Sequence, residues 1–209
     1  MSEARQEILR RLRRGNGGEP HPGSWQSPRT FPDLVSRFVE ALEASHGETF
    51  VEDDAGAAVS RLERVLVELG ARRIVCQDEP PLDSLDLPER LPAFEWHVVG
   101  QTTGSLRAIC AEADVGVSSA QAALSETGTV VVDSGPGRSR LVTLLPPVHV
   151  VLLPADRLVA DLFALVEQQE QPLPANVTLI SGPSKTADIE QTLAIGVHGP
   201  RRLVVIVYS

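Results

Sequence analysis

The sequence contains a single lysine, two cysteines and no long apolar run. Of its 19 basic residues all but Lys185 are arginines, and 28 acidic residues bring the formal net charge to −9. This acidity argues against general nucleic-acid binding, because the phosphate backbone is recognised mainly by positive charge. No stretch approaches the ~18 uninterrupted apolar residues that a membrane-spanning helix needs. We therefore expect neither a nucleic-acid partner nor a membrane span.

The two cysteines, Cys76 and Cys110, are far apart and form no C-x-x-C pair. This excludes a four-cysteine iron–sulfur site and a cysteine-rich structural zinc site within this chain. The first 14 residues also lack the apolar core of a secretory signal. We therefore predict a cytoplasmic protein with two free thiols, no metal site and no cofactor of its own.

Three segments differ in composition. Residues 1–14 carry five arginines, with Ile8, Leu9 and Leu12 at helical spacing, which predicts a short basic amphipathic helix that forms a mobile or partner-docking arm. Residues 15–33 are dense in glycine, proline and serine, which is typical of a linker. The length of 209 residues suits one domain with a small appendage, so we place a single domain at 34–209.

Within that domain, near-continuous apolar strands alternate with amphipathic helices. Such a pattern is typical of a sheet covered on both faces, so the fold class expected is a layered α/β fold. A short helix or turn is expected between the strands 115–118 and 129–133, and residues 78–92 are expected to form a loop. Helices are predicted at 33–46, 55–69, 155–169 and 185–195, and strands at 49–52, 73–76, 96–99, 115–118, 129–133, 177–181 and 203–208. Residues 141–145 and 148–153 are two further apolar runs, broken by Pro146 and Pro147.

The most informative segment is the string GPSKTADIE at 182–190. A predicted strand leads into a turn at Gly182, and a predicted helix then begins. Ser184 is placed to cap that helix, whose first turn would favour an anion, with positive charge from Lys185 and a hydroxyl from Thr186. The alternative is a plain turn with a capping serine and an exposed lysine.

The second segment is LSETGT at 124–129, where Glu126 precedes a turn at Gly128. A carboxylate in this position either bonds backbone amides of the turn or serves as a catalytic acid or base. The third segment is GVHGP at 196–200, where His198 follows the predicted helix. This histidine either bonds the last helix carbonyls or contributes to a site.

No established catalytic or phosphate-binding motif is present. The glycine-rich segment 135–140 is not followed by the Gly-Lys-Ser/Thr of a Walker loop, and there is no G-x-S-x-G, H-E-x-x-H or G-x-G-x-x-G. Spacing alone therefore assembles no catalytic triad.

These three strings together closely resemble the signature of the LUD (lactate-utilisation) domain family, and the small size and lack of cysteine clusters resemble its protein C (LutC) branch. The resemblance covers about residues 34–209. The family more often has arginine where this chain has Lys185, and alanine where it has Ser125. Lysine keeps the positive charge but loses the two-point grip of a guanidinium on a carboxylate.

The resemblance implies a NagB/RpiA/CoA-transferase-like fold and a role in oxidising L-lactate to pyruvate, together with partner proteins that hold iron–sulfur clusters. It thus implies a small subunit without a cluster, which we expect to bind a small anionic ligand at the turn that runs from Gly182 to Thr186. The expected ligand-binding residues are Gly128, Gly182, Ser184, Lys185, Thr186, Asp188 and His198, with Glu126 as the candidate catalytic residue.

Two other functions stay open at this point. CoA-transferase relatives use a glutamate near a glycine turn as nucleophile, which by analogy suggests a stand-alone CoA-transferase-like or sugar-phosphate-isomerase-like enzyme that uses Glu126. The arginine-rich arm suggests a scaffolding protein that docks a partner. The sequence does not determine the oligomeric state.

Overall fold

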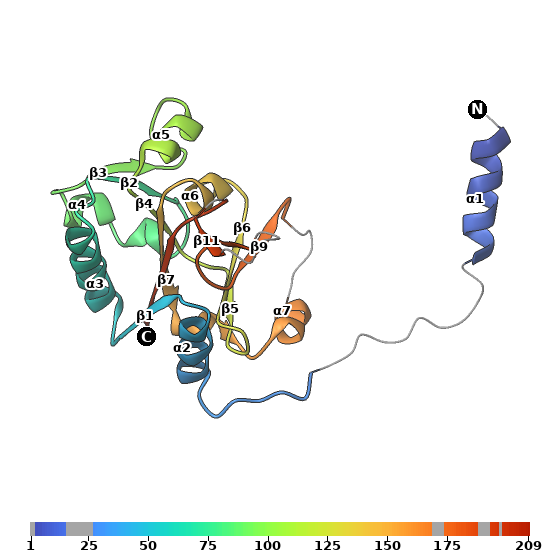
Figure 1. The fold of residues 1–209 in the computed structure, drawn as a ribbon, viewed down its shortest axis with the longest axis horizontal. Coiled ribbons are helices and arrows are strands. Elements are labelled where there is room, and N and C mark those ends of the chain that lie inside the picture. The colour runs from blue at the N-terminus through green and yellow to red at the C-terminus, as the bar shows by residue number, and fades with distance from the viewer. Residues whose placement is uncertain (1–2, 16–26, 169–173, 188–192, 197) are drawn as a thin grey trace.

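A computed structural model describes residues 3–15, 27–168, 174–187, 193–196 and 198–209. Its centre is a six-stranded sheet in the order β1-β12-β7-β4-β2-β3, in which all paired strands are parallel (Figure 1). The strands are β1 (Glu48–Glu52), β2 (Arg73–Cys76), β3 (Glu95–Val98), β4 (Val115–Ser118), β7 (Val148–Pro154) and β12 (Arg202–Tyr208).

Neighbouring side chains of the central strands are buried on opposite faces of this sheet. Val150 and Leu152 of β7 pack in one apolar cluster, whereas Val151 and Leu153 pack in another. Because both faces are covered, the central strands β7 and β12 are rich in Val, Ile and Leu. The expected layered α/β fold with helices on both faces is thereby confirmed.

The helices divide between the two faces. On one face α3 packs with Leu62 and Leu66 fully buried, and on the other α2 packs with Phe38 and Leu42 fully buried. Asp33 and Asp54 cap these two helices by accepting hydrogen bonds from backbone amides of the first turn. The α-helices are α1 (Glu3–Gly15), α2 (Leu34–Ala44), α3 (Ala55–Glu68), α4 (Leu87–Arg90), α5 (Leu106–Glu112), α6 (Arg140–Leu144) and α7 (Leu162–Gln168).

A smaller four-stranded sheet, in the order β8-β5-β6-β9, packs over the α2 side of the large sheet. It contains β5 (Ala122–Leu124), β6 (Thr129–Asp133), β8 (Leu158–Val159) and β9 (Val177–Ile180). The segment between 118 and 129 is therefore a strand and a turn, so the helical alternative expected there is wrong. Pairing with β6 decides the conformation, since Ala122 lies opposite Val131.

Two predicted helices are also corrected. The predicted helix at 155–169 is a 3-10 turn (Ala155–Arg157), the strand β8 and only then α7, because Leu158 pairs beside Ala123 of β5. The predicted helix at 185–195 is instead an antiparallel pair, β10 (Lys185–Ala187) and β11 (Leu193–Ile195). Residues 78–92 contain a 3-10 turn (Leu82–Ser84) and α4 in addition to loop.

The predicted N-terminal helix is present as α1, and the middle of the predicted linker lies outside the described residues. Within the part of the chain that the structure describes, no helix is both long and apolar enough to cross a membrane.

Candidate functional site

The Glu126 and Gly182 strings lie side by side along α2. The guanidinium of Arg37 donates to the carbonyl of Glu126 at 2.9 Å. One turn further along α2, a Cβ on Gly128 would come 2.2 Å from the amide nitrogen of Leu42, and at the end of the helix a Cβ on Gly182 would come 2.7 Å from the carbonyl oxygen of Ser45. Both glycines are therefore required for close backbone packing against α2, in addition to any role in ligand binding.

Strand pairing brings these two strings together. β6 pairs with β9 so that Val130 lies opposite Ile180, which places Thr129 beside Ser181. The Thr129 hydroxyl lies 2.8 Å from the Ser181 hydroxyl and 2.6 Å from that of Thr127. A row of three hydroxyls thus links the two strings, as expected if they form one region of the surface.

The carboxylate of Glu126 forms an ion pair with Arg29, and 30% of its side chain is exposed. Its backbone amide donates to the carbonyl of Ala160. The turn is thus tied to the segment before α2 and to the end of β8. These contacts give Glu126 a structural role, and its catalytic role remains a prediction.

The ammonium group of Lys185 lies at the C-terminal end of α2. It donates to the carbonyl of Ser45 at 3.0 Å and lies 2.9 Å from Nδ1 of His46. The carbonyl end of a helix carries partial negative charge, so this contact stabilises α2. Lys185 is therefore a cation at a helix C-terminus and not, as the sequence predicted, a cation at a helix N-terminus.

Ser184 does not cap a helix, which corrects a second part of the expected site. Its amide donates to the carbonyl of Pro200, and its own carbonyl accepts from Gly196. These bonds hold Ser184 extended at the start of the β10–β11 pair. A Cβ on Gly199 would lie 3.3 Å from the Ser184 Cβ, so the third string packs directly on the second.

The remaining predicted residues are only partly placed. His198 is described and exposed. Thr186 lies in β10 opposite Ala194, and its side chain lies outside the described part of the structure. Asp188 lies outside the described residues altogether. The structure therefore brings Gly128, Gly182, Ser184 and Lys185 together and leaves Asp188 undecided.

This region adjoins the amino ends of the large sheet's strands. Lys185 contacts the residues just before β1, and the amide of Arg201, just before β12, donates to the carbonyl of Pro147, just before β7. In open α/β sheets, ligands usually bind outside the opposite, carboxyl ends of the strands. The carboxyl edge of the large sheet is therefore a second candidate location for a ligand-binding site.

Buried polar side chains collect at that carboxyl edge. Glu79, which follows β2, is only 3% exposed, and its carboxylate accepts from the amide of Ser119 at 2.8 Å. Burial raises the pKa of the Glu79 carboxyl, with a smaller opposing effect from this hydrogen bond. Beside it, Ser118 at the end of β4 lies 2.8 Å from Nε2 of His149, a fully buried residue near the amino end of β7 whose pKa burial lowers to about 3. This histidine is therefore neutral near pH 7.

Arg157 closes this cluster from the turn before β8. Its Nη1 donates to the carbonyl of Ala120 and the hydroxyl of Ser119, and its Nη2 donates to the carbonyl of Pro80. All three acceptors are uncharged. No carboxylate of the described chain forms an ion pair with Arg157, in contrast to Arg138, which lies 2.9 Å from Asp133.

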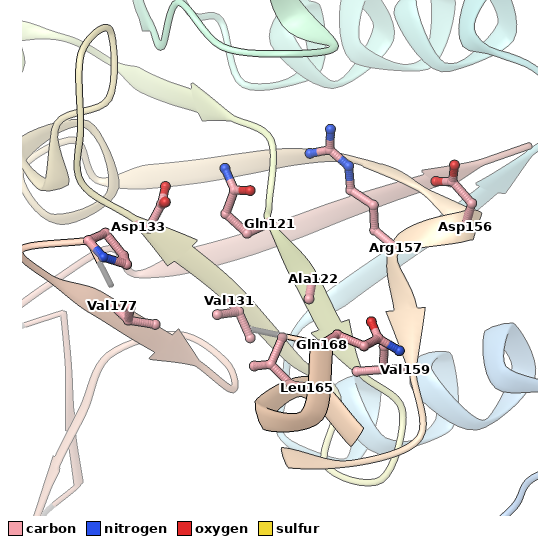
Figure 2. Close-up of a pocket in the computed structure, with 11 residues that line it drawn as sticks. Gln121, Ala122, Val131, Asp133, Asp156, Arg157, Val159, Leu165, Gln168 and Val177 are labelled. Atoms are coloured by element: carbon pink, nitrogen blue, oxygen red, sulfur yellow. The ribbon is translucent and has the colours of Figure 1, made fainter. Parts of the chain in front are cut away.

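A cavity of about 390 Å³ opens beside Arg157, on the outer face of the small sheet (Figure 2). Figure 2 shows the polar side chains of Gln121, Asp133 and Arg157 on one side and Val131 and Leu165 on the other. A cavity of this volume, with an apolar wall and a few polar groups, is typical of small-molecule sites.

The family model of the LUD domain matches residues 35–208 of this sequence. The chain belongs to the LUD-domain family.

Individual relatives agree with this assignment. A protein named Lactate utilization protein C from Halalkalibacterium halodurans is 37% identical over 160 residues, which cover 71% of this chain and 70% of that protein. Proteins of the same name from Exiguobacterium and Shouchella clausii are 38% and 30% identical, over 67% and 84% of this chain and 63% and 79% of theirs.

A crystal structure of a DUF162-family protein from Deinococcus radiodurans matches with a TM-score of 0.57. The match covers 84% of this chain and 96% of that one at 19% identity. The similarity supports the fold.

The cysteines of this LUD domain are not placed as metal ligands. Cys76 and Cys110 are buried and free, and burial raises the pKa of both thiols. Among the described residues, no three His, Cys, Asp or Glu side chains are grouped so as to hold a metal ion.

Sequence reasoning missed the carboxyl-edge cluster of the LUD domain because no single motif marks it. One signal was available. Polar residues follow two neighbouring buried strands of the large sheet, with Gln77 and Glu79 after β2 and Ser119 after β4. Carboxyl ends of parallel strands meet at one edge, so such residues gather there. Arg157 carried no comparable signal, since it lay inside a predicted helix.

Proposed function

We propose that this protein acts in lactate utilisation, as a subunit of a system that oxidises L-lactate to pyruvate. The observation that carries the proposal is the 37% identity to a protein named Lactate utilization protein C, over about 70% of both chains. The LUD-domain match over residues 35–208 supports it.

Within such a system this chain is the subunit without a cluster, and partner proteins hold the iron–sulfur clusters. The state of the two cysteines supports this division. A thiol must be deprotonated to ligate iron, and burial opposes that in both Cys76 and Cys110. The electrons released from lactate therefore pass through partner subunits.

The turn from Gly182 to Thr186 is the proposed site for a small anion. Lys185 supports the proposal because its ammonium has three N–H donors, and Ser45 and His46 account for two. The third donor is available to a carboxylate or phosphate at the end of α2. Since the lysine also stabilises α2, an anion there competes with the partial negative charge of the helix end.

Growth on L-lactate tests the role of the protein. Deletion of its gene should abolish growth on L-lactate and leave growth on glucose or pyruvate unchanged. A plasmid copy should restore growth, and the tagged protein should co-purify with cysteine-rich partners. Normal growth of the deletion strain on L-lactate would refute the proposed function.

Calorimetric titration tests the turn. L-lactate, pyruvate and phosphate are titrated into wild-type protein, the variants Lys185→Ala and Lys185→Arg, and the control Arg64→Ala, which removes an exposed arginine from α3. We expect at least one ligand to bind wild type, with affinity lost only in Lys185→Ala. Equal affinity in Lys185→Ala and wild type would place the anion elsewhere.

A further inference from the structure

The cavity of Figure 2 has two chemically different sides. Val131 and Val159 of the small sheet are buried in one apolar cluster with Ala122 and Leu124, and Leu165 of α7 packs against it. Gln121, Asp133, Asp156 and Arg157 line the other side, and the exposed amide of Gln168 lies beside Leu165 on the first. An occupant that matches both sides has an apolar body and a polar end.

The remaining donors of Arg157 favour an anionic end, although Asp133 and Asp156 also line this side and the buried Glu79 interacts electrostatically with Arg157. Asp133 is neutralised by Arg138 at 2.9 Å. Asp156 is exposed, so water screens its charge. Arg157 is held in place by three neutral acceptors, and a guanidinium has five N–H donors, so Nε–H and one Nη2–H remain. The remaining donors suit a carboxylate.

The volume leaves room for an occupant larger than lactate. L-lactate has six heavy atoms, which take up no more than about 180 Å³ even at roughly 30 Å³ each, the share of a water molecule in the liquid. The cavity holds about 390 Å³. A three-carbon acid therefore fills at most about half of this space, and an acid with a longer apolar chain fills more of it and has more surface to place on the apolar side.

We propose that this cavity is a binding site for an organic monocarboxylate with an apolar chain, whose carboxylate contacts Arg157 and Gln121 and whose chain lies on Val131, Val159 and Leu165. The site is separate from the turn at Gly182. Its ligand would be a second ligand of the protein, larger than lactate. The assignment of this site does not depend on a role in lactate utilisation.

Calorimetric titration with matched probes tests this site. Hexanoate, hexylamine, hexan-1-ol and L-lactate are titrated into the full-length protein. We expect hexanoate to bind at least tenfold more tightly than the amine, the alcohol and lactate. Tighter binding of hexylamine than of hexanoate would overturn the proposal, because the two aspartates and not Arg157 would then dominate the cavity.

Variants locate the probe. Arg157→Gln keeps a donor for the neighbouring carbonyls and removes the charge, and should weaken hexanoate binding at least tenfold. Val177→Glu changes a residue that is 40% exposed at the cavity wall, so it is expected to fold, and its carboxylate should repel the probe to a similar degree. Arg64→Gln on α3 is the control and should bind as wild type does.

The results separate this proposal from the proposed function. Absence of hexanoate binding to folded wild type at millimolar concentration would overturn the site, as would wild-type affinity in both Arg157→Gln and Val177→Glu. Growth on L-lactate is scored independently, so either proposal can fail while the other holds.

Discussion

The ammonium of Lys185 lies 3.0 Å from the carbonyl oxygen of Ser45, the residue that caps the C-terminus of α2. The only lysine of the chain, in its most distinctive string, thus contacts a helix 140 residues earlier in the sequence. The contact gives the string a structural reason to retain a cation, independent of any ligand.

Lys185→Met should therefore destabilise the protein even without ligand. We expect a loss of about 0.5–1 kcal/mol in the free energy of unfolding, the usual contribution of a cation near a helix C-terminus. Urea denaturation at low salt measures it, and the loss should shrink in 1 M NaCl because salt screens the charge. Lys185→Arg is the matched variant and should stay close to wild type. A Met variant as stable as wild type at low salt would contradict the assignment.

Gly128→Ala should be among the most destabilising conservative changes in the protein. Gly128 has a φ of +62°, and an added Cβ would come 2.2 Å from the backbone of Leu42. The left-handed conformation costs alanine about 1–2 kcal/mol and the overlap costs about 1–3 kcal/mol more. Urea denaturation should show a total loss of about 3 kcal/mol.

Gly70→Ala is the control for that variant. Gly70 has the same φ of +62°, and nothing lies within 4 Å of its added Cβ. It should lose only the conformational part, about 1–2 kcal/mol. Equal losses at both glycines would mean that the approach of the turn to α2 is not tight.

His149 should make the protein less stable as the pH falls below about 6.5. Burial lowers its pKa in the folded protein to about 3, so between these values the unfolded chain binds a proton that the folded chain does not. The stabilising contribution of His149 is fully present above its pKa in the unfolded chain. It is lost as the pH falls toward its pKa in the folded protein, by at most about 1.4 kcal/mol per pH unit.

The comparison with His149→Gln isolates this contribution. Glu79, whose pKa burial raises, contributes in the opposite direction, since its stabilising contribution is lost as pH rises, but it is present in both proteins and cancels. Free energies of unfolding at pH 7, 6 and 5 should therefore fall more steeply for wild type than for the variant. Parallel pH profiles would contradict this prediction, because they would mean that His149 binds a proton as readily in the folded protein as in the unfolded chain.

Neither thiol should react in the folded protein. Cys76 and Cys110 are both buried, at 4% and 0% exposure, and burial raises the pKa of each. Since the thiolate is the reactive species, labelling with iodoacetamide at pH 7.5 should be slow in buffer and complete for both residues in urea. Rapid labelling of one thiol in buffer would reveal an opening of the core around it.

Local sequence pattern predicted most elements of the large sheet and its covering helices. In α2 and α3 the apolar residues recur at helical spacing, and aspartates cap both helices. In β7 and β12 most residues are Val, Ile or Leu, as is typical of strands in a sheet buried on both faces. Each of these features depends on neighbours along the chain.

The apolar pattern gave wrong secondary-structure predictions where long-range strand pairing outweighs local helix preference. Leu158 and Val159 match a helical stripe with later residues, but they are buried because they pair with β5. In α7 itself, Leu162 and Val166 are 44% and 61% exposed, although they continue the apolar stripe of the predicted helix at 155–169. Spacing indicates that apolar residues need burial, and it does not state which element buries them.

The sequence by itself determined the layered α/β fold, the absence of a cysteine cluster and, through three short strings, the family. Only the tertiary structure decided that Lys185 lies at a helix C-terminus, that Gly128 and Gly182 serve the packing on α2, and that Arg157 lies beside a cavity without an ion pair to any carboxylate of the described residues. The physical reason is that burial periodicity is encoded by near neighbours, whereas strand pairing and the ends of parallel strands bring together residues that are distant along the chain.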